Sequence, residues 1–208
     1  MHCFTEGFPF TVSELIDVEE VRACQHCSDL PLGPRPILQY GAAAPILLVG
    51  QAPGRLAHER GRPFADPSGV RLRSWLGVDE ETFYDPDCFA LLPMGFCYPG
   101  TGKGGDLPPR PECAPLWRAR LLGGMQNVRL TVLIGQYALR WHLGEGGRGR
   151  VADIVSAWRE HWPEVLPAPH PSPRNQRWLR NHPWFEGEVV PALQARVAEL
   201  LGSRGNAS

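Results

Sequence analysis

Residues 45–54 read PILLVGQAPG, and this stretch predicts the fold class. An apolar run that stops at glycine and proline is typical of a buried parallel strand followed by a tight loop. Similar runs occur at 89–92 and 130–135, with a weaker one at 165–167. Stretches with helical spacing flank or separate these runs: 11–22, 71–76, 114–122, 137–143, 151–161 and 188–201. This alternation predicts an α/β fold, a three-layer α/β/α domain around a central four-stranded parallel sheet.

Length and composition indicate one domain. The chain has 208 residues, of which 43% are hydrophobic, enough to bury one core. We expect a monomeric domain over 1–201 and a disordered tail over 202–208. The N-terminus lacks a secretory pattern and no long apolar run occurs, so we expect a cytoplasmic protein without a membrane span. A net charge of −1 argues against a protein that coats nucleic acid through a large basic surface.

The loops that follow the predicted strands carry the unusual residues. Ligands of open α/β sheets bind beyond the carboxyl ends of the strands. The first of these loops, 50–69, is rich in glycine and proline and contains His58, Glu59, Phe64 and Asp66. Its backbone amides can face a ligand, so we interpret this long loop as functional.

The segment after the last predicted strand, 170–178, reads HPSPRNQRW. Two prolines hold the backbone extended beside His170. Ser172, Arg174 and Asn175 offer donors that a DNA phosphate backbone accepts, and we predict that they bind DNA.

These two segments resemble the two signature motifs of the uracil-DNA glycosylase superfamily: GQAPG at 50–54 and HPSP at 170–173. GRPF at 61–64 is similar to a stretch of the thermostable iron–sulfur branch, whereas HPSPRN at 170–175 looks more like the single-strand-selective branch. The resemblance implies an enzyme that flips a base out of DNA into a pocket and hydrolyses its N-glycosidic bond. It places Gln51, Ala52 and Phe64 at the base, with the Phe64 ring stacking on it.

Cysteines give a separate line of argument. Cys24 and Cys27 form a Cys-x-x-Cys pair, and Cys97 and Cys113 lie 16 positions apart. Thiols stay reduced in the cytosol, so metal ligation is the better interpretation. The resemblance implies that these four cysteines ligate a [4Fe–4S] cluster, with a structural zinc ion as the alternative. The other two cysteines are interpreted as a free terminal thiol and a small buried hydrophobe: Cys3 and Cys88.

The catalytic assignments follow from the charges of the reaction. Breaking the bond makes the sugar positive and the base negative, so a carboxylate and hydrogen-bond donors are needed. Many superfamily members hold the attacking water with Asp or Asn at the position of Ala52. One iron–sulfur branch that also has alanine there carries an aspartate just before a Ser-Gly pair, and Asp66 resembles it. This resemblance assigns the water to Asp66, with His58 or Glu59 in reserve, and the base side is assigned to His170. A turn cap at Asp66 is the structural alternative.

Base recognition departs from the family pattern at Pro93. Iron–sulfur relatives carry an asparagine four positions before the third cluster cysteine, where it reads the uracil edge. Pro93 stands there in this chain. We therefore expect DNA containing uracil or another deaminated base as substrate, with single strands preferred. The alternative is an inactive iron–sulfur protein that binds DNA lesions.

Overall fold

A central parallel sheet organises the protein, which we analysed in a computed structural model that describes residues 17–202. Its strands are β1 (Ile46–Val49), β2 (Phe89–Leu91), β5 (Leu130–Ile134) and β6 (Val165–Ala168). They lie in the order β2-β1-β5-β6, and every neighbouring pair is parallel. The prediction of a four-stranded parallel sheet is confirmed.

One face of the sheet packs against α3 (Pro67–Leu76), α7 (Val151–Ser156) and α9 (Val190–Gly202). Ile46 and Leu48 of β1 belong to this fully buried cluster. Side chains alternate between the two faces of a strand, so the residues between them must face the other way.

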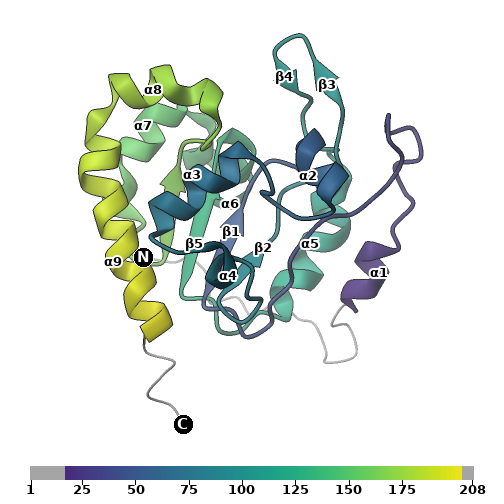
Figure 1. The fold of residues 1–208 in the computed structure, drawn as a ribbon, viewed down its shortest axis with the longest axis horizontal. Coiled ribbons are helices and arrows are strands. Elements are labelled where there is room, and N and C mark those ends of the chain that lie inside the picture. Colours follow the sequence, from purple (N-terminus) through teal and green to yellow (C-terminus); the bar gives the residue numbers. More distant parts are fainter. Residues whose placement is uncertain (1–16, 203–208) are drawn as a thin grey trace.

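The opposite face packs against α5 (Cys113–Gly123) and α6 (Gln136–Leu143). Leu47 and Val49 of β1 belong to this second cluster. Because both faces of the sheet are covered, its strands are apolar at almost every position, Thr131 of β5 being the exception, and this explains the nearly continuous runs in the sequence. Figure 1 shows the resulting three layers.

Several helices differ from their predicted bounds. Of the opening helix predicted over 11–22, the structure describes α1 (Val18–Arg22), and 11–16 lie outside the described residues. Strand β2 ends one residue early, and α3 starts four residues early because Asp66 caps it. The stretch 151–161 divides into α7 and a short 3-10 turn, Trp158–Glu160. Further helical segments precede or follow the predicted ones: α8 (Gln176–Asn181), the 3-10 turns Gly144–Arg148 and Pro173–Asn175, and a π-helical turn, Phe185–Val189.

Segments that the sequence indicated as loops contain additional structure. The long loop after β1 holds α2 (Arg55–Arg60), and α4 (Glu80–Phe83) precedes β2. A hairpin of β3 (Thr101–Gly102) and β4 (Gly105–Asp106) stands out from the segment after β2 (Figure 1). Of the tail, Gly202 ends α9 and 203–208 lie outside the described residues. No helix within 17–202 has the length and apolar character needed to cross a membrane.

Candidate active site

An open pocket gathers most of the predicted site residues. The first loop, the end of β2, the β3–β4 hairpin and the second motif all contribute to its wall. The predicted residues that line it are Gln51, Ala52, Phe64, Asp66, Pro93, His170, Ser172 and Arg174. Three predicted residues, His58, Glu59 and Asn175, are not part of this wall. One residue that the sequence did not single out, Asp106, is.

Phe64 reaches the pocket through an unusual backbone conformation. Its φ angle is 53°, in the left-handed region that residues with a side chain rarely adopt. A Cβ at Gly69 would collide with the Phe64 carbonyl oxygen, so only glycine permits this turn. A Cβ on Gly50 would come within 3.0 Å of the Phe64 ring, which meets Phe83 edge to face at 6.3 Å between centroids. The surrounding structure therefore holds Phe64 in place at the pocket.

Asp66 combines a structural contact with access to the pocket. Its Oδ1 accepts a hydrogen bond from the Gly69 amide at 2.9 Å and so caps α3. The predicted turn cap is thus present. Its Oδ2 lies 3.7 Å from the position that a Cβ would occupy on Gly54, a residue of the pocket wall. One oxygen is engaged by the helix and the other is directed toward Gly54.

His170 is held in one orientation by its own loop. Its Nδ1 accepts a hydrogen bond from the Ser172 amide at 3.2 Å, and the Asn175 side chain donates to its carbonyl at 2.8 Å. Burial lowers the pKa of His170, although Asp66 and Asp106 act in the opposite direction. The ring is therefore neutral near pH 7, and because Nδ1 accepts, its proton resides on Nε2.

Arg71 on α3 fixes the same loop and was not indicated by the sequence. Its guanidinium donates to the Ser172 carbonyl at 3.1 Å and to the Gln176 side chain at 2.7 Å. Since Asp66 caps α3 at its N-terminus, one helix positions both Asp66 and the loop of His170. No local pattern could have shown this contact between residues about 100 positions apart.

His58 and Glu59, the reserve residues, lie outside the pocket wall. His58 is buried, its Nδ1 has no hydrogen-bond partner among residues 17–202, and its ring lies 5.9 Å from that of Tyr98 between centroids. Burial and the nearby Arg35 lower the pKa of His58. Glu59 pairs with Arg55 at 2.8 Å on the exposed side of α2.

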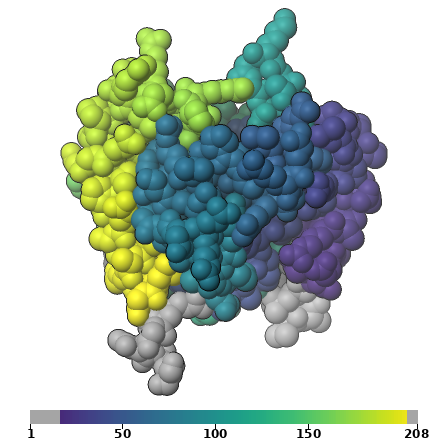
Figure 2. All heavy atoms as spheres, viewed as in Figure 1, coloured from purple at the N-terminus to yellow at the C-terminus, as the bar shows by residue number. Residues whose placement is uncertain are grey.

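The β3–β4 hairpin is docked against both motifs. The Gln51 side chain donates to the Leu107 carbonyl at 3.0 Å. The Arg174 guanidinium packs against Gly105, where a Cβ would collide with it. Figure 2 shows the teal hairpin at the top of the molecule, with a yellow-green segment reaching across to it. The Asn175 side-chain amide donates to the His170 carbonyl, so it bonds to its own loop.

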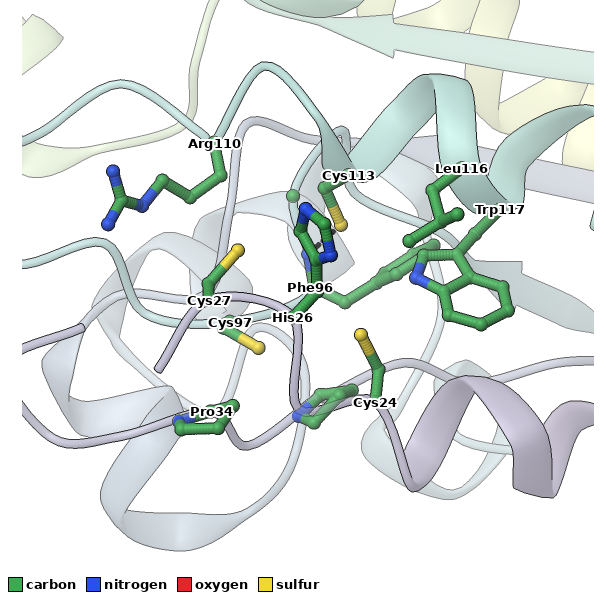
Figure 3. Close-up of a pocket in the computed structure, with 12 residues that line it drawn as sticks. Cys24, His26, Cys27, Pro34, Phe96, Cys97, Arg110, Cys113, Leu116 and Trp117 are labelled. Atoms are coloured by element: carbon green, nitrogen blue, oxygen red, sulfur yellow. Dashed lines mark hydrogen bonds between the residues drawn. The ribbon is translucent and has the colours of Figure 1, made fainter. Parts of the chain in front are cut away.

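A second pocket collects the four cysteines of the predicted cluster (Figure 3). Cys24 and Cys27 follow α1, Cys97 follows β2, and Cys113 is the first residue of α5. The rest of the wall is mainly apolar, and includes Phe96, Leu116 and Trp117. Three chain segments that are far apart in sequence thus bring their thiols to one place.

Burial governs the chemistry of these thiols. It raises the pKa of Cys97 to about 11 and that of Cys113 to about 12. The Phe96 amide donates to the Cys113 sulfur at 3.4 Å. Within 17–202, no three His, Cys, Asp or Glu side chains are arranged to hold one metal ion. Four sulfur donors around one apolar pocket fit the donor set of an iron–sulfur cluster.

The two remaining cysteines are Cys88, in the turn before β2, and Cys3. Cys88 is partly buried and packs against the core cluster, as expected of a small hydrophobe, and its thiol also donates to the Asp85 carboxylate at 3.3 Å. A polar turn before β2 supplies this partner. Cys3 lies outside the described residues.

Arg118 on α5 connects the cysteine pocket with the candidate active site. It is almost fully buried and donates to the carbonyls of Leu92 and Pro93 at 2.9 and 3.1 Å. It also donates to His142 Nε2 at 3.1 Å. Burial, together with the Arg118 charge, lowers the pKa of His142 to about 3, so His142 stays a neutral acceptor. The helix that starts at Cys113 therefore positions the backbone at Pro93.

A family model described as the uracil DNA glycosylase superfamily matches residues 38–194. The chain belongs to this superfamily. The matched range contains the whole sheet, both motifs, Cys97 and Cys113. The match begins after Cys24 and Cys27, so the first cysteine pair lies outside the region that is similar to the uracil DNA glycosylase superfamily.

Proposed function

We propose that the protein is a DNA glycosylase that hydrolyses the N-glycosidic bond of uracil, or of another deaminated base, in DNA. The observation that carries this proposal is that Asp66, His170 and Phe64 come from distant segments and line one pocket. Membership of the uracil DNA glycosylase superfamily supports the same reaction class.

The roles follow from how charge develops as the bond breaks. The sugar becomes positive, and a carboxylate at Asp66 stabilises it and holds the attacking water. The base leaves with the bonding electrons, and the Nε2–H of neutral His170 donates to its oxygen. The Phe64 ring supplies a flat surface on which the flipped base stacks.

Base identity is the less constrained part of the proposal. Ala52 and Pro93 both line the pocket, and neither offers a polar side-chain group. The Pro93 carbonyl already accepts from Arg118. A pocket with few fixed partners discriminates less between bases. We therefore propose that excision extends beyond uracil to bases such as hypoxanthine or xanthine.

The cysteine pocket supports a [4Fe–4S] cluster held by Cys24, Cys27, Cys97 and Cys113. When bound, the cluster supplies iron–thiolate bonds that crosslink the N-terminal segment, the loop after β2 and α5. Hydrolysis transfers no electron, so the proposed role is structural. One zinc ion is the alternative occupant.

Single-stranded DNA is the proposed preferred form. Enzymes that extract a base from a duplex commonly insert an apolar wedge, whereas the loop after His170 offers Arg174, Asn175 and Gln176. Unpaired bases cost less to flip. We expect single strands to react fastest, a G·U mismatch more slowly and a normal pair slowest, and equal rates on all three would contradict the preference.

The test of the function uses labelled oligonucleotides that contain uracil, hypoxanthine or xanthine. Purified protein is incubated with single and double strands, and alkali then cleaves the strand at any abasic site. We expect cleavage at uracil in the wild type and much less in Asp66→Asn. Tight binding without abasic sites would instead identify a lesion-binding protein, an outcome that the apolar Ala52 and Pro93 would explain.

A further inference from the structure

A second carboxylate faces the candidate active site. Asp106 lies at the end of β4, in a glycine-rich hairpin that the motifs do not include. It lines the same pocket as Asp66 and His170. Within this pocket the two aspartates are the only carboxylates among its wall residues in the described part of the chain.

The position of Gly54 sets an upper limit on the distance between these two carboxylates. A Cβ at Gly54 would lie 3.1 Å from Oδ2 of Asp106 and 3.7 Å from Oδ2 of Asp66. The two oxygens are therefore no more than about 6.8 Å apart, the sum of these distances. One water that bonds both oxygens spans about 5.5 Å, twice a usual hydrogen bond. The separation is thus compatible with one bridging water.

The hairpin fixes the orientation of Asp106. Thr101 and Asp106 are directly opposite each other in the β3–β4 pair, and the Thr101 hydroxyl donates to Oδ1 at 3.3 Å. The Tyr98 hydroxyl bonds that of Thr101 at 2.6 Å. As in Asp66, one oxygen is engaged by the protein and the other is directed toward Gly54. The Gln51 contact to Leu107 holds the hairpin in this position.

We propose that Asp106 is a second catalytic carboxylate, which shares the attacking water with Asp66. This inference rests on the proposed glycosylase function. The water oxygen bonds to C1′ of the sugar while the bond from C1′ to the base nitrogen breaks. The water proton goes to the Asp106 carboxylate, and the base departs with the electron pair of the broken bond. Asp66 remains charged beside the positive sugar. Such a division of work between two carboxylates is familiar from other enzymes that hydrolyse glycosidic bonds.

The chemistry explains why Ala52 is tolerated. Ala52 of the first motif cannot hold a water, the Gln51 side-chain amide donates to the Leu107 carbonyl, and one oxygen of Asp66 accepts from the Gly69 amide. Asp106 supplies the missing acceptor from a different element. Its exposure in the free protein is consistent with this role, because bound DNA would cover the open pocket.

The experiment compares Asp106→Asn, Asp66→Asn and the double variant by single-turnover excision of uracil from a single-stranded oligonucleotide. Lys103→Gln is the matched control, because it changes a charge on the same hairpin outside the pocket wall. We expect Asp106→Asn to lower the rate by about 10²-fold or more, the range for an acid–base group. Lys103→Gln should retain the wild-type rate. The double variant should lose much less than the product of the single losses, since both residues act on one water.

A binding measurement separates catalysis from structure. Removal of a negative charge beside DNA should leave affinity for the uracil oligonucleotide unchanged or tighter, and the thermal midpoint should not move. Asp106→Asn with the full wild-type rate would overturn the inference while leaving the proposed function intact. Loss of rate accompanied by weaker binding and a lower thermal midpoint would also overturn it, because the residue would then support the hairpin. No excision by the wild type would instead contradict the proposed function.

A second variant probes the space between the carboxylates. Gly54→Ala places a methyl group 3.1 Å from Asp106 and 3.7 Å from Asp66, where the water would sit. We expect slower excision with little change in thermal stability, because Gly54 has an ordinary extended backbone that alanine also adopts. Unchanged excision would contradict a water held at this point.

Discussion

One stretch of chain, residues 93–113, contributes to the walls of both pockets, although the two pockets differ in polarity. Pro93 and Asp106 face an open polar pocket, whereas Cys97 and Cys113 face one with mainly apolar walls. Polar groups in the first keep contact with water and stay available for a ligand. Thiols in the second are desolvated, and this raises their pKa values. In the function proposed above, the polar pocket carries out the chemistry and the cysteine pocket stabilises the fold.

The largest effect should follow from damage to the cysteine pocket. Protein prepared without air should be brown and contain about four irons per chain. Cys97→Ser or Cys113→Ser should lose the colour and much of the solubility, because three segments lose their crosslink. Cys88→Ser, outside that pocket, is the control and should keep the iron. Metal analysis and thermal melting measure these changes. Colourless protein with one zinc would contradict the cluster.

Substitutions in the polar pocket should change rate rather than stability. Asp66→Asn and His170→Ala should each slow single-turnover excision by about 10²–10⁴-fold. Asparagine still caps a helix, so Asp66→Asn should melt close to the wild-type temperature. If Asp66→Asn stays fully active while His58→Ala or Glu59→Gln abolishes excision, the reserve residues hold the water instead.

Most of the architecture could be predicted because its signals are local. Four apolar runs, each ended by glycine, proline or a turn, describe strands covered on both faces. Two motifs at the carboxyl ends of β1 and β6 must meet at one edge of a parallel sheet. That Asp66 and His170 line one pocket is therefore what the order of strands and motifs in the sequence leads us to expect.

The contacts that could not be predicted are made between distant segments. Asp106 comes from a glycine-rich hairpin, flanked by prolines, whose sequence indicates only a loop. Arg71 and Arg118 are ordinary helix residues until tertiary packing directs them at carbonyls of the sites. The sequence also could not show that His58 would lie on α2 with a buried side chain that does not line the pocket.

Pro93 offers a smaller test of the polar pocket. Pro93→Asn restores a side-chain amide that can pair with the edge of uracil. One such contact contributes about 1–3 kcal/mol, roughly a 5- to 150-fold change in rate. We expect the variant to favour uracil over hypoxanthine more strongly than the wild type does, once folding and metal content are shown to be unchanged. Wild-type activity confined to uracil, and unaltered in the variant, would mean that position 93 does not contact the base.

The smallest effect concerns the connection between the pockets. His142 accepts from Arg118 only while neutral, and its pKa is about 3 in the folded protein. An unfolded histidine titrates near 6.5, so the unfolded state binds this proton first. The free energy of unfolding should therefore fall as pH drops below about 6.5, by about 1–2 kcal/mol between pH 7 and 5. His142→Asn should flatten this dependence in denaturant titrations, and an equal slope in both proteins would contradict it.

The central claim is that the polar pocket breaks an N-glycosidic bond, and mass spectrometry of the reaction products tests it most directly. Excess protein is mixed with a single-stranded uracil oligonucleotide, and samples are quenched over time. The account predicts free uracil and an abasic strand in equal amounts, with both products nearly absent for Asp66→Asn. Recovery of the intact oligonucleotide, bound but without released base, would contradict it.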